Sequence, residues 1–161
     1  MFTNTKGARE IQLGEILFLN DDNTVQGAGI DHSAANNLQV YSFDPSTATV
    51  SASHSVQGGG TGREFPPNIL NHGSEAWNKW YQASSSTASI TVDFKAAHQF
   101  RGIGFRAAND CPHRDPDVAK VHFMINGAFT EVATFDLGLF GGPRWNTKKF
   151  LLPQAYSTDK V

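Results

Sequence analysis

The dipeptide Asn126-Gly127 constrains the fold of this chain more than any other feature of its sequence. It separates two runs of strand-forming residues, Ala119–Ile125 and Ala128–Phe135. Asn-Gly between two such runs is the strongest short-range signal for a β-hairpin, because both residues tolerate the positive φ angles of a type I′ turn. We therefore predict two antiparallel strands joined by a tight turn.

Several other short segments of the chain are also rich in strand-forming residues, and turn-forming residues separate them. Residues 89–94 alternate, so that Ile90, Val92 and Phe94 are predicted to point inward. Residues 47–56, 100–107 and 145–152 also read as strands, whereas helical periodicity is absent apart from one turn near residues 74–79. About seven or eight short strands with 18 aromatic residues predict an all-β jelly-roll sandwich with an aromatic core.

The N-terminal part of the chain carries one further strand and then a long polar segment. Residues 11–19 are predicted to place Ile11, Leu13, Leu17 and Leu19 on one face, with Glu15 among them. Residues 20–46 are rich in Asn, Asp, Gly and Ala, which indicates a functional or contact loop. We expect a single domain over residues 1–161, with a strand in 1–19, a long loop or arm in 20–46 and the sandwich body in 47–161.

Charge and composition exclude several classes of protein. The 161 residues have a formal net charge of −2, which argues against a nucleic-acid binder that works through bulk charge. A single cysteine, Cys111, rules out an intrachain disulfide, and we expect it to be a small packing residue. The sequence shows neither a secretory signal nor a membrane-spanning stretch, so we expect an intracellular or particle-associated protein, or an extracellular module cut from a longer chain.

No pattern in the sequence points to catalysis. The chain lacks the Gly-x-Ser-x-Gly, Walker-type and His-Glu-x-x-His motifs, and its six histidines show no metal-ligand spacing. The glycine run at residues 58–62 is not followed by a helical pattern, so it does not predict a phosphate-binding loop. We expect a protein that is not an enzyme.

The most distinctive segment is the loop at residues 106–117, which links two predicted strands. Pro112 and Pro116 stiffen it, and it also contains an Asn-Asp turn signal. One interpretation is that the loop only locks a corner of the sandwich. The other is a preorganised polar rim for a ligand, whose donors are Arg106, Asn109, His113 and Arg114.

Three large aromatic residues lie within a five-residue segment, at Trp77, Trp80 and Tyr81. An aromatic face suits the C–H face of a sugar ring, whereas the usual use of a large aromatic residue is to fill the core. We assign Trp80 to the core and Trp77 to the surface, where Trp77 is a candidate for sugar stacking.

Taken in order, three motifs resemble the discoidin or coagulation-factor C-type domain, which has a galactose-binding-like fold shared with many carbohydrate-binding modules. They are residues 71–80, with Asn71-His72-Gly73 and Asn78-Lys79-Trp80, residues 90–94 and residues 103–116. The family pattern has Asp where this chain has His72, Thr at Asn78 and Leu at Phe94. The resemblance covers residues 50–156 and implies a glycan-binding module.

The order of the segments departs from that family. Residues 11–18 resemble its closing strand, which normally lies at the C-terminus, and residues 155–161 resemble the start of its penultimate strand. We therefore expect a permuted arrangement, with residues 11–18 inside the sandwich, Glu15 near the Trp80 turn and the two chain ends close together. A segment cut from a tandem array, or strands exchanged between subunits, would give the same order.

The resemblance also implies a calcium site between the Asp-Gly turn and the closing strand. Its ligands here would be Glu15, Asn71 and Asn78, together with loop carbonyls. Calcium takes six to eight oxygen ligands, and His72 at the family's Asp position removes one carboxylate.

Two functions from different classes fit these observations. The first is a non-catalytic module that recognises a glycan or glycoconjugate through Trp77 and the polar rim. The second is a structural subunit that decorates a virion or another large particle and contacts other protein subunits through its long polar arm. Fold alone does not choose between them.

Overall fold

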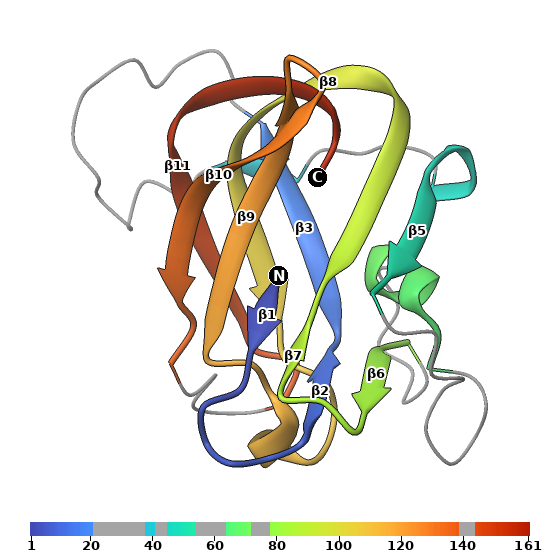
Figure 1. Cartoon of the computed structure of the whole chain (residues 1–161), viewed down its shortest axis with the longest axis vertical. Coiled ribbons are helices and arrows are strands. Elements are labelled where there is room, and N and C mark those ends of the chain that lie inside the picture. Colours follow the sequence, from blue (N-terminus) through green and yellow to red (C-terminus); the bar gives the residue numbers. More distant parts are fainter. Residues whose placement is uncertain (21–37, 41–44, 54–63, 72–77, 139–143) are drawn as a thin grey trace.

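The computed structural model describes residues 1–20, 38–40, 45–53, 64–71, 78–138 and 144–161 (Figure 1). These residues form antiparallel strands and three short 3-10 helices, and no α-helix occurs among them. The strands pack as two facing layers, so the prediction of an all-β sandwich is confirmed. Within the same ranges, no helix has the length and apolar character needed to cross a membrane.

One layer is a four-stranded sheet in the order β10-β9-β1-β7. Its strands are β1 (Phe2–Thr3), β7 (Thr87–Ala88), β9 (Val118–Ile125) and β10 (Ala128–Asp136). The predicted hairpin is confirmed, because Ala128 pairs with Ile125 across the turn. Asn126 has a φ of 52° and Gly127 a φ of 81°, as a type I′ turn requires.

The other layer has the order β11-β8-β3-β4, and β5 pairs with β8 beside this path. Its strands are β3 (Glu15–Asn20), β4 (Gln39–Val40), β5 (Thr49–Ala52), β8 (Ile90–Arg106) and β11 (Thr147–Lys160). The sequence predicts two strands where the structure has the single 17-residue β8. Lys95 has a φ of 65°, which marks the irregularity at which β8 passes from pairing with β5 to pairing with β3.

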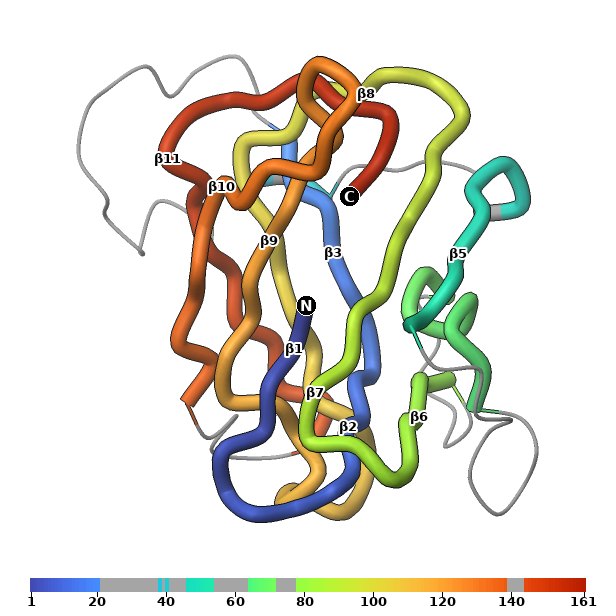
Figure 2. The backbone as a smooth tube through the Cα atoms, viewed as in Figure 1, coloured from blue at the N-terminus to red at the C-terminus, as the bar shows by residue number. Residues whose placement is uncertain are grey.

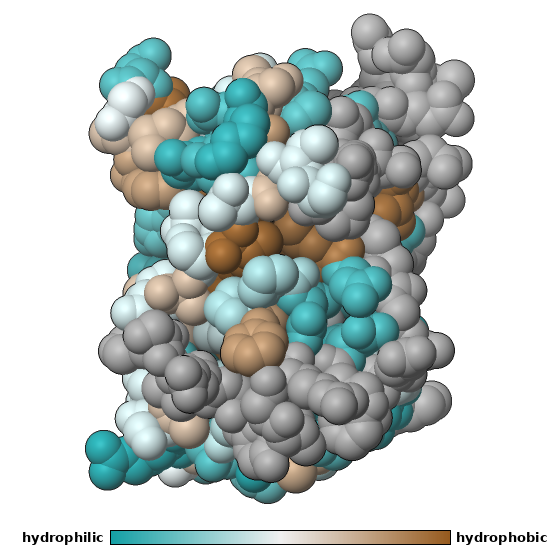
Figure 3. Space-filling model, turned by 90° about the vertical axis from the view of Figure 1, so that its right-hand side faces the viewer, coloured by the Kyte–Doolittle hydropathy of each residue, from teal (hydrophilic) through white to brown (hydrophobic). Residues whose placement is uncertain are grey.

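A two-stranded ribbon and the helical turns complete the fold. β2 (Glu10–Leu13) pairs with β6 (Trp80–Ala83), and the turns are η1 (Pro45–Thr47), η2 (Pro66–Leu70) and η3 (Pro112–Arg114). Figure 3 shows the face that carries β5, η2 and β6, where hydrophilic side chains surround a central apolar strip. This mixed surface agrees with the low charged fraction of 17%.

The space between the two layers is filled mainly by aromatic rings, as the sequence predicts. Phe18, Phe94 and Phe100 contact one another with ring centroids 4.9–5.3 Å apart. Farther along, Phe135 stacks on Phe150 at 4.6 Å. Trp80 is fully buried, as predicted, and it packs against Phe2. Such ring pairs add about 0.5–1.5 kcal/mol each beyond the area they bury.

The predicted face of residues 11–19 is wrong beyond Gly14. Ile11 and Leu13 face the main core, but the next residues to do so are Ile16 and Phe18, whereas Leu17 and Leu19 lie in a separate cluster with Leu38. The alternation slips by one residue at Gly14, which separates β2 from β3. Gly14 approaches the neighbouring chain so closely that a Cβ there would lie 2.6 Å from the carbonyl oxygen of Ala107. Two strands with opposite phase therefore replace the predicted single strand.

The two ends of the described chain lie near each other, as predicted (Figure 2). Met1 and Val161 line the same pocket. β3, from the N-terminal part of the chain, lies within the five-stranded sheet beside β8, so residues 15–18 are inside the sandwich, as expected. Residues 11–13 belong instead to β2, which pairs with β6 in the separate ribbon, although Ile11 and Leu13 still face the core.

Candidate functional site

The connection between β8 and β9 lies at one end of the sandwich, near β2 (Figure 1). Hydrogen bonds of polar side chains join this connection there to β2 and to the residues before β11. Asn4, Gln12, Lys79 and Asp115 are buried in this region. Buried polar groups are stable only when they are hydrogen-bonded, so their partners show what holds the loop in place.

The base of this region is an ion pair with a glutamine beside it. The Arg144 guanidinium donates two hydrogen bonds to the Asp115 carboxylate, at 2.7 and 2.9 Å. Gln12 Nε2 donates to the carbonyl of Cys111 at 3.0 Å and also to that of Asp110. The Asn4 side chain donates to the carbonyl of His113 at 2.7 Å. These contacts tie the backbone of residues 110–115 to three other parts of the chain.

A second ion pair fixes the neighbouring side of the loop. Lys79 Nζ lies 2.6 Å from Asp110 Oδ1 and 3.1 Å from Glu64 Oε1, and the lysine side chain is only 3% exposed. A lysine is rarely this buried unless it is paired. The start of β6 is therefore joined to the loop by a desolvated cation.

Glu10, at the start of β2, is a partly exposed carboxylate at this end that two side chains hold in place. It accepts a hydrogen bond from the Tyr81 hydroxyl at 2.6 Å and one from Arg114 Nε at 2.5 Å. The Arg114 guanidinium also lies 5.0 Å from the centroid of the Tyr81 ring. The hydrogen bond from Tyr81, followed by that from Arg114, lowers the pKa of Glu10 below its usual value. Burial and the same hydrogen bond raise the pKa of Tyr81 to about 12.

A shallow pocket of about 460 Å³ opens beside Glu10. It is lined by Ala8, Arg9, Glu10, Ala83, Ser84 and His113. The side chains of Arg9 and His113 are exposed. The pocket thus offers a fixed carboxylate acceptor next to a guanidinium and an imidazole, which are groups that can hydrogen-bond to vicinal hydroxyls.

The structure divides the predicted rim residues between two places. His113 lines the pocket. Arg114 does not line it, but its Nε donates a hydrogen bond to the carboxylate of Glu10, which does. Arg106 instead pairs with Glu15 at 2.8 Å and lies 5.0 Å from the ring of Trp145. Within the described part of the chain, the buried Asn109 Oδ1 has no hydrogen-bond partner.

Two further predictions about single residues have different outcomes. The predicted stacking residue, Trp77, lies outside the described residues. Cys111 is a free, half-buried thiol with a left-handed φ of 41°, so it shapes the turn before η3 more than it fills the core.

Sequence reasoning missed Arg9 and Glu10, which complete the pocket. Glu10 pairs with Ala83, which lies far from it in the sequence, in the ribbon of β2 and β6. Both residues line the same pocket as His113. The one local signal is a charged pair directly before an apolar strand, which usually indicates only a solvated strand end.

The residues implied as calcium ligands do not form a suitable site. The Glu15 carboxylate is 3% exposed and already holds the Arg106 guanidinium. Asn71 donates to Asn78 Oδ1 at 3.0 Å, so these two side chains do meet. Among the residues that the structure describes, no group of three His, Cys, Asp or Glu side chains is placed to hold a metal ion. One carboxylate that is neutralised by arginine does not fit a cation that takes six to eight oxygens.

Comparison of the chain with protein-family models, with curated proteins and with solved structures finds no match. The function is therefore argued from the geometry of this end of the sandwich.

Proposed function

We propose that this protein is a non-catalytic binding module that recognises a glycan. The observation that supports it most is the shallow pocket in which Glu10, Arg9 and His113 meet at the loop end of the sandwich. A sugar hydroxyl both donates and accepts hydrogen bonds, so it needs an acceptor and a donor side by side. The carboxylate of Glu10 is the acceptor, and Arg9 and His113 are the donors.

The preorganisation of Glu10 supports binding rather than a purely structural role. Its two oxygens are oriented by Tyr81 and Arg114 before any ligand arrives, so little side-chain entropy is lost on binding. An open, shallow site also suits a hydrated ligand such as a sugar, which keeps part of its surface in water.

The resemblance to the discoidin domain agrees with this proposal. In a galactose-binding-like jelly roll with permuted strand order, the rim would be the connection between β8 and β9, to which His113 and Arg114 belong. Trp77 remains the proposed stacking platform for the sugar ring.

A glycan array tests the proposal directly, with His113→Ala as the site variant. His113 is exposed, and its contact with Asn4 uses only the backbone carbonyl, so the variant leaves the loop intact. We expect binding of the preferred glycan to weaken about tenfold, because one or two hydrogen bonds are lost. His122→Ala, in the middle of β9, is the matched control and should leave glycan binding unchanged. Equal binding by wild type and His113→Ala would place the glycan elsewhere.

The array also separates the second hypothesis, an accessory subunit of a virion or another large particle. That function predicts silence across the array together with defined oligomers or incorporation into a particle. Trp77→Ala belongs in the same experiment, because loss of binding in that variant supports the stacking role.

A further inference from the structure

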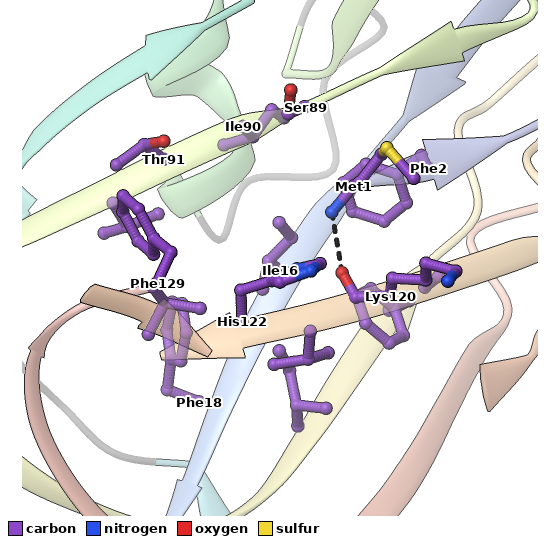
Figure 4. A pocket seen from close by; sticks show the side chains of 16 residues that line it. Met1, Phe2, Ile16, Phe18, Ser89, Ile90, Thr91, Lys120, His122 and Phe129 are labelled. Atoms are coloured by element: carbon purple, nitrogen blue, oxygen red, sulfur yellow. Dashed lines mark hydrogen bonds between the residues drawn. The ribbon is translucent and has the colours of Figure 1, made fainter. Parts of the chain in front are cut away.

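A second pocket, of about 290 Å³, lies between the two sheets and shares no lining residue with the proposed glycan site (Figure 4). Its inner wall is formed by Phe2 of β1, Ile16 and Phe18 of β3, and Ile103 and Phe105 of β8. All five side chains belong to the buried core. The pocket is thus an opening into the aromatic interior and not a surface groove.

The two ends of the chain lie in one line along the segment 87–93 (Figure 2). Phe2 pairs with Ala88, and the backbone of Val161 exchanges two hydrogen bonds with Val92, at 2.8 and 2.9 Å. Both pairings are antiparallel, so β1 runs in the same direction as the end of β11. The two ends therefore act as two parts of one edge strand.

That edge strand is open at two positions. The register of β1 places Met1 opposite Ser89. The positions that remain between the two ends are those opposite Ile90 and Thr91. Within the described ranges, no residue is paired with either of them on this edge. A strand advances about 3.3 Å per residue, so two residues in extended conformation would fill the opening.

The backbone of Ile90 faces this opening. In an antiparallel pair, alternate residues direct both their N–H and their C=O to the same edge. Val92 directs both groups to Val161. On the other edge, the carbonyl of Ser89 accepts a hydrogen bond from the N–H of Ser53 at 2.9 Å. Ile90 therefore presents one donor and one acceptor to the opening, which the backbone of a single amino-acid residue could satisfy.

The pocket lies where the side chain of such a residue would point. Phe2 belongs to the buried core, and Val161 packs against it. The position opposite Ile90 lies two residues along the edge from each of them. Because side chains alternate between the faces of a sheet, a side chain at this position would also point into the core. The pocket is thus a space for one inward-pointing side chain.

The volume of the pocket suits a large apolar side chain. An apolar cavity of about 150 Å³ stays dry and holds benzene. The pocket between the sheets, at about 290 Å³, has room for the side chain of leucine or phenylalanine.

The mouth of the pocket favours an uncharged ligand. Burial lowers the pKa of the Met1 amine to about 6, so this amine is mostly uncharged at neutral pH. It donates a hydrogen bond to the carbonyl of Lys120 at 2.6 Å, and Lys120 Nζ lies 3.1 Å from Glu131. Phe129 lines the pocket and is 48% exposed, so an apolar ring lies at the mouth. A charged group would lose its hydration there without gaining a new partner of opposite charge.

We propose that this pocket binds a short, uncharged peptide segment in extended conformation, with one large apolar side chain. The side chain lies between the sheets against Phe18 and Phe105. The backbone N–H of the same residue donates to the carbonyl of Ile90, and its C=O accepts from the N–H of Ile90. The ligand thereby completes the edge strand between the two chain ends.

NMR titration with N-acetyl-L-phenylalanine amide tests the side chain, because this compound is one uncharged residue with a peptide group on each side. It should bind at least about tenfold more tightly than N-acetyl-L-alanine amide, since the ring is buried. The D-enantiomer should bind about tenfold more weakly, because its side chain points to the other face when its backbone is paired. No binding at about 10 mM, or equal affinity for the L- and D-compounds or for the phenylalanine and alanine compounds, would overturn the proposal.

Hydrogen exchange tests the backbone pairing. With N-acetyl-L-phenylalanine amide bound, exchange of the Ile90 amide should slow by about tenfold. The Thr91 amide is the internal control, because the alternation directs it to β5, and its exchange should not change. Methylation of the ligand's phenylalanine nitrogen removes the donor to Ile90 and should weaken binding about fivefold. Unchanged exchange at Ile90, or full affinity of the methylated compound, would contradict the pairing.

A protein variant tests the location of the site. Phe129→Ala should weaken binding of N-acetyl-L-phenylalanine amide about fivefold, because the Phe129 ring covers part of the bound side chain. Phe65→Ala is the matched control: Phe65 is similarly exposed, at 44%, but does not line the pocket. Equal losses in the two variants would place the compound elsewhere and overturn the proposal.

Discussion

Asp115 and Arg144 are joined by two parallel hydrogen bonds, although 29 residues separate them in the chain. The Asp115 carboxylate is 2% exposed, so the guanidinium is what makes its burial possible. Gln12 also lies against this carboxylate, at 3.3 Å. The pair therefore holds the loop that presents His113 to the shallow pocket.

Removing the arginine should destabilise the protein strongly. Arg144→Gln leaves a buried carboxylate with no compensating charge, and we expect the free energy of unfolding to fall by about 3 kcal/mol. Urea denaturation measures this change. The control is Lys95→Gln, which removes one partner of an exposed ion pair and should alter stability by less than about 1 kcal/mol. Similar effects from the two substitutions would contradict the role given to Asp115.

The hydrogen bond between Tyr81 and Glu10 should be visible in the titration of both groups. In Tyr81→Phe, the pKa of Glu10 should rise toward its ordinary value of 4.5, because the main cause of its depression is gone. A depressed carboxyl pKa stabilises the fold above pH 4.5, and this stability is lost as the pH falls through the lowered pKa. NMR titration of the Glu10 carboxyl tests this, and an unchanged pKa in the variant would contradict the assignment. In the wild type, the Tyr81 hydroxyl should ionise near pH 12.

Asp93 should titrate at an unusually low pH despite its place at the surface. The backbone N–H of Lys95 donates a hydrogen bond to the Asp93 carboxylate at 3.0 Å. This bond, followed by hydrogen bonds from the side chains of Lys160 and Lys95, lowers the pKa of Asp93 to about 2. The stability that it contributes is present above pH 3.8 and is lost as the pH falls toward 2. Asp93→Asn should therefore flatten the pH dependence of stability between pH 4 and 2, as measured by urea denaturation at each pH. An unchanged slope would rule out this contribution.

Substitutions at two glycines, Gly14 and Gly127, should destabilise the protein for different reasons. Gly14→Ala brings a Cβ to within 2.6 Å of the carbonyl oxygen of Ala107, and we expect a loss of about 1–3 kcal/mol. Gly127→Ala meets no atom within 4 Å, but it places a Cβ at a φ of 81°, so about 1 kcal/mol is lost. Gly127→Asn should cost less than Gly127→Ala, because asparagine adopts the left-handed region more readily. Thermal unfolding measures all three, and a neutral Gly14→Ala would remove the steric account of the break between β2 and β3.

The hairpin and the sandwich class follow from local patterns. The dipeptide Asn126-Gly127 by itself predicts a type I′ turn. The alternation of Ile90, Val92 and Phe94 predicts which face of their strand points into the core. These features depend on residues that are close together in the chain, which is why sequence reasoning finds them.

Two other features cannot be predicted from local patterns. They are the change at Gly14 in which residues face the core, and the set of residues that line the shallow pocket. The slip depends on the carbonyl of Ala107, and the pocket depends on the pairing of β2 with β6. The sequence predicts Arg106 and Arg114 as donors to a ligand, but the carboxylate that each one meets in the fold depends on residues far away in the chain. Glu15 and Glu10, which pair with them, both come from the N-terminal strands.

The measurement that tests glycan binding most directly is NMR chemical-shift mapping with the sugar that scores highest on the array. The account predicts that backbone shifts change at Arg9, Glu10, Ala83 and His113 and stay constant around Phe129. Shift changes confined to the pocket at Phe129, or no change at any sugar concentration up to about 10 mM, a weak-binding limit, would contradict the proposed glycan site.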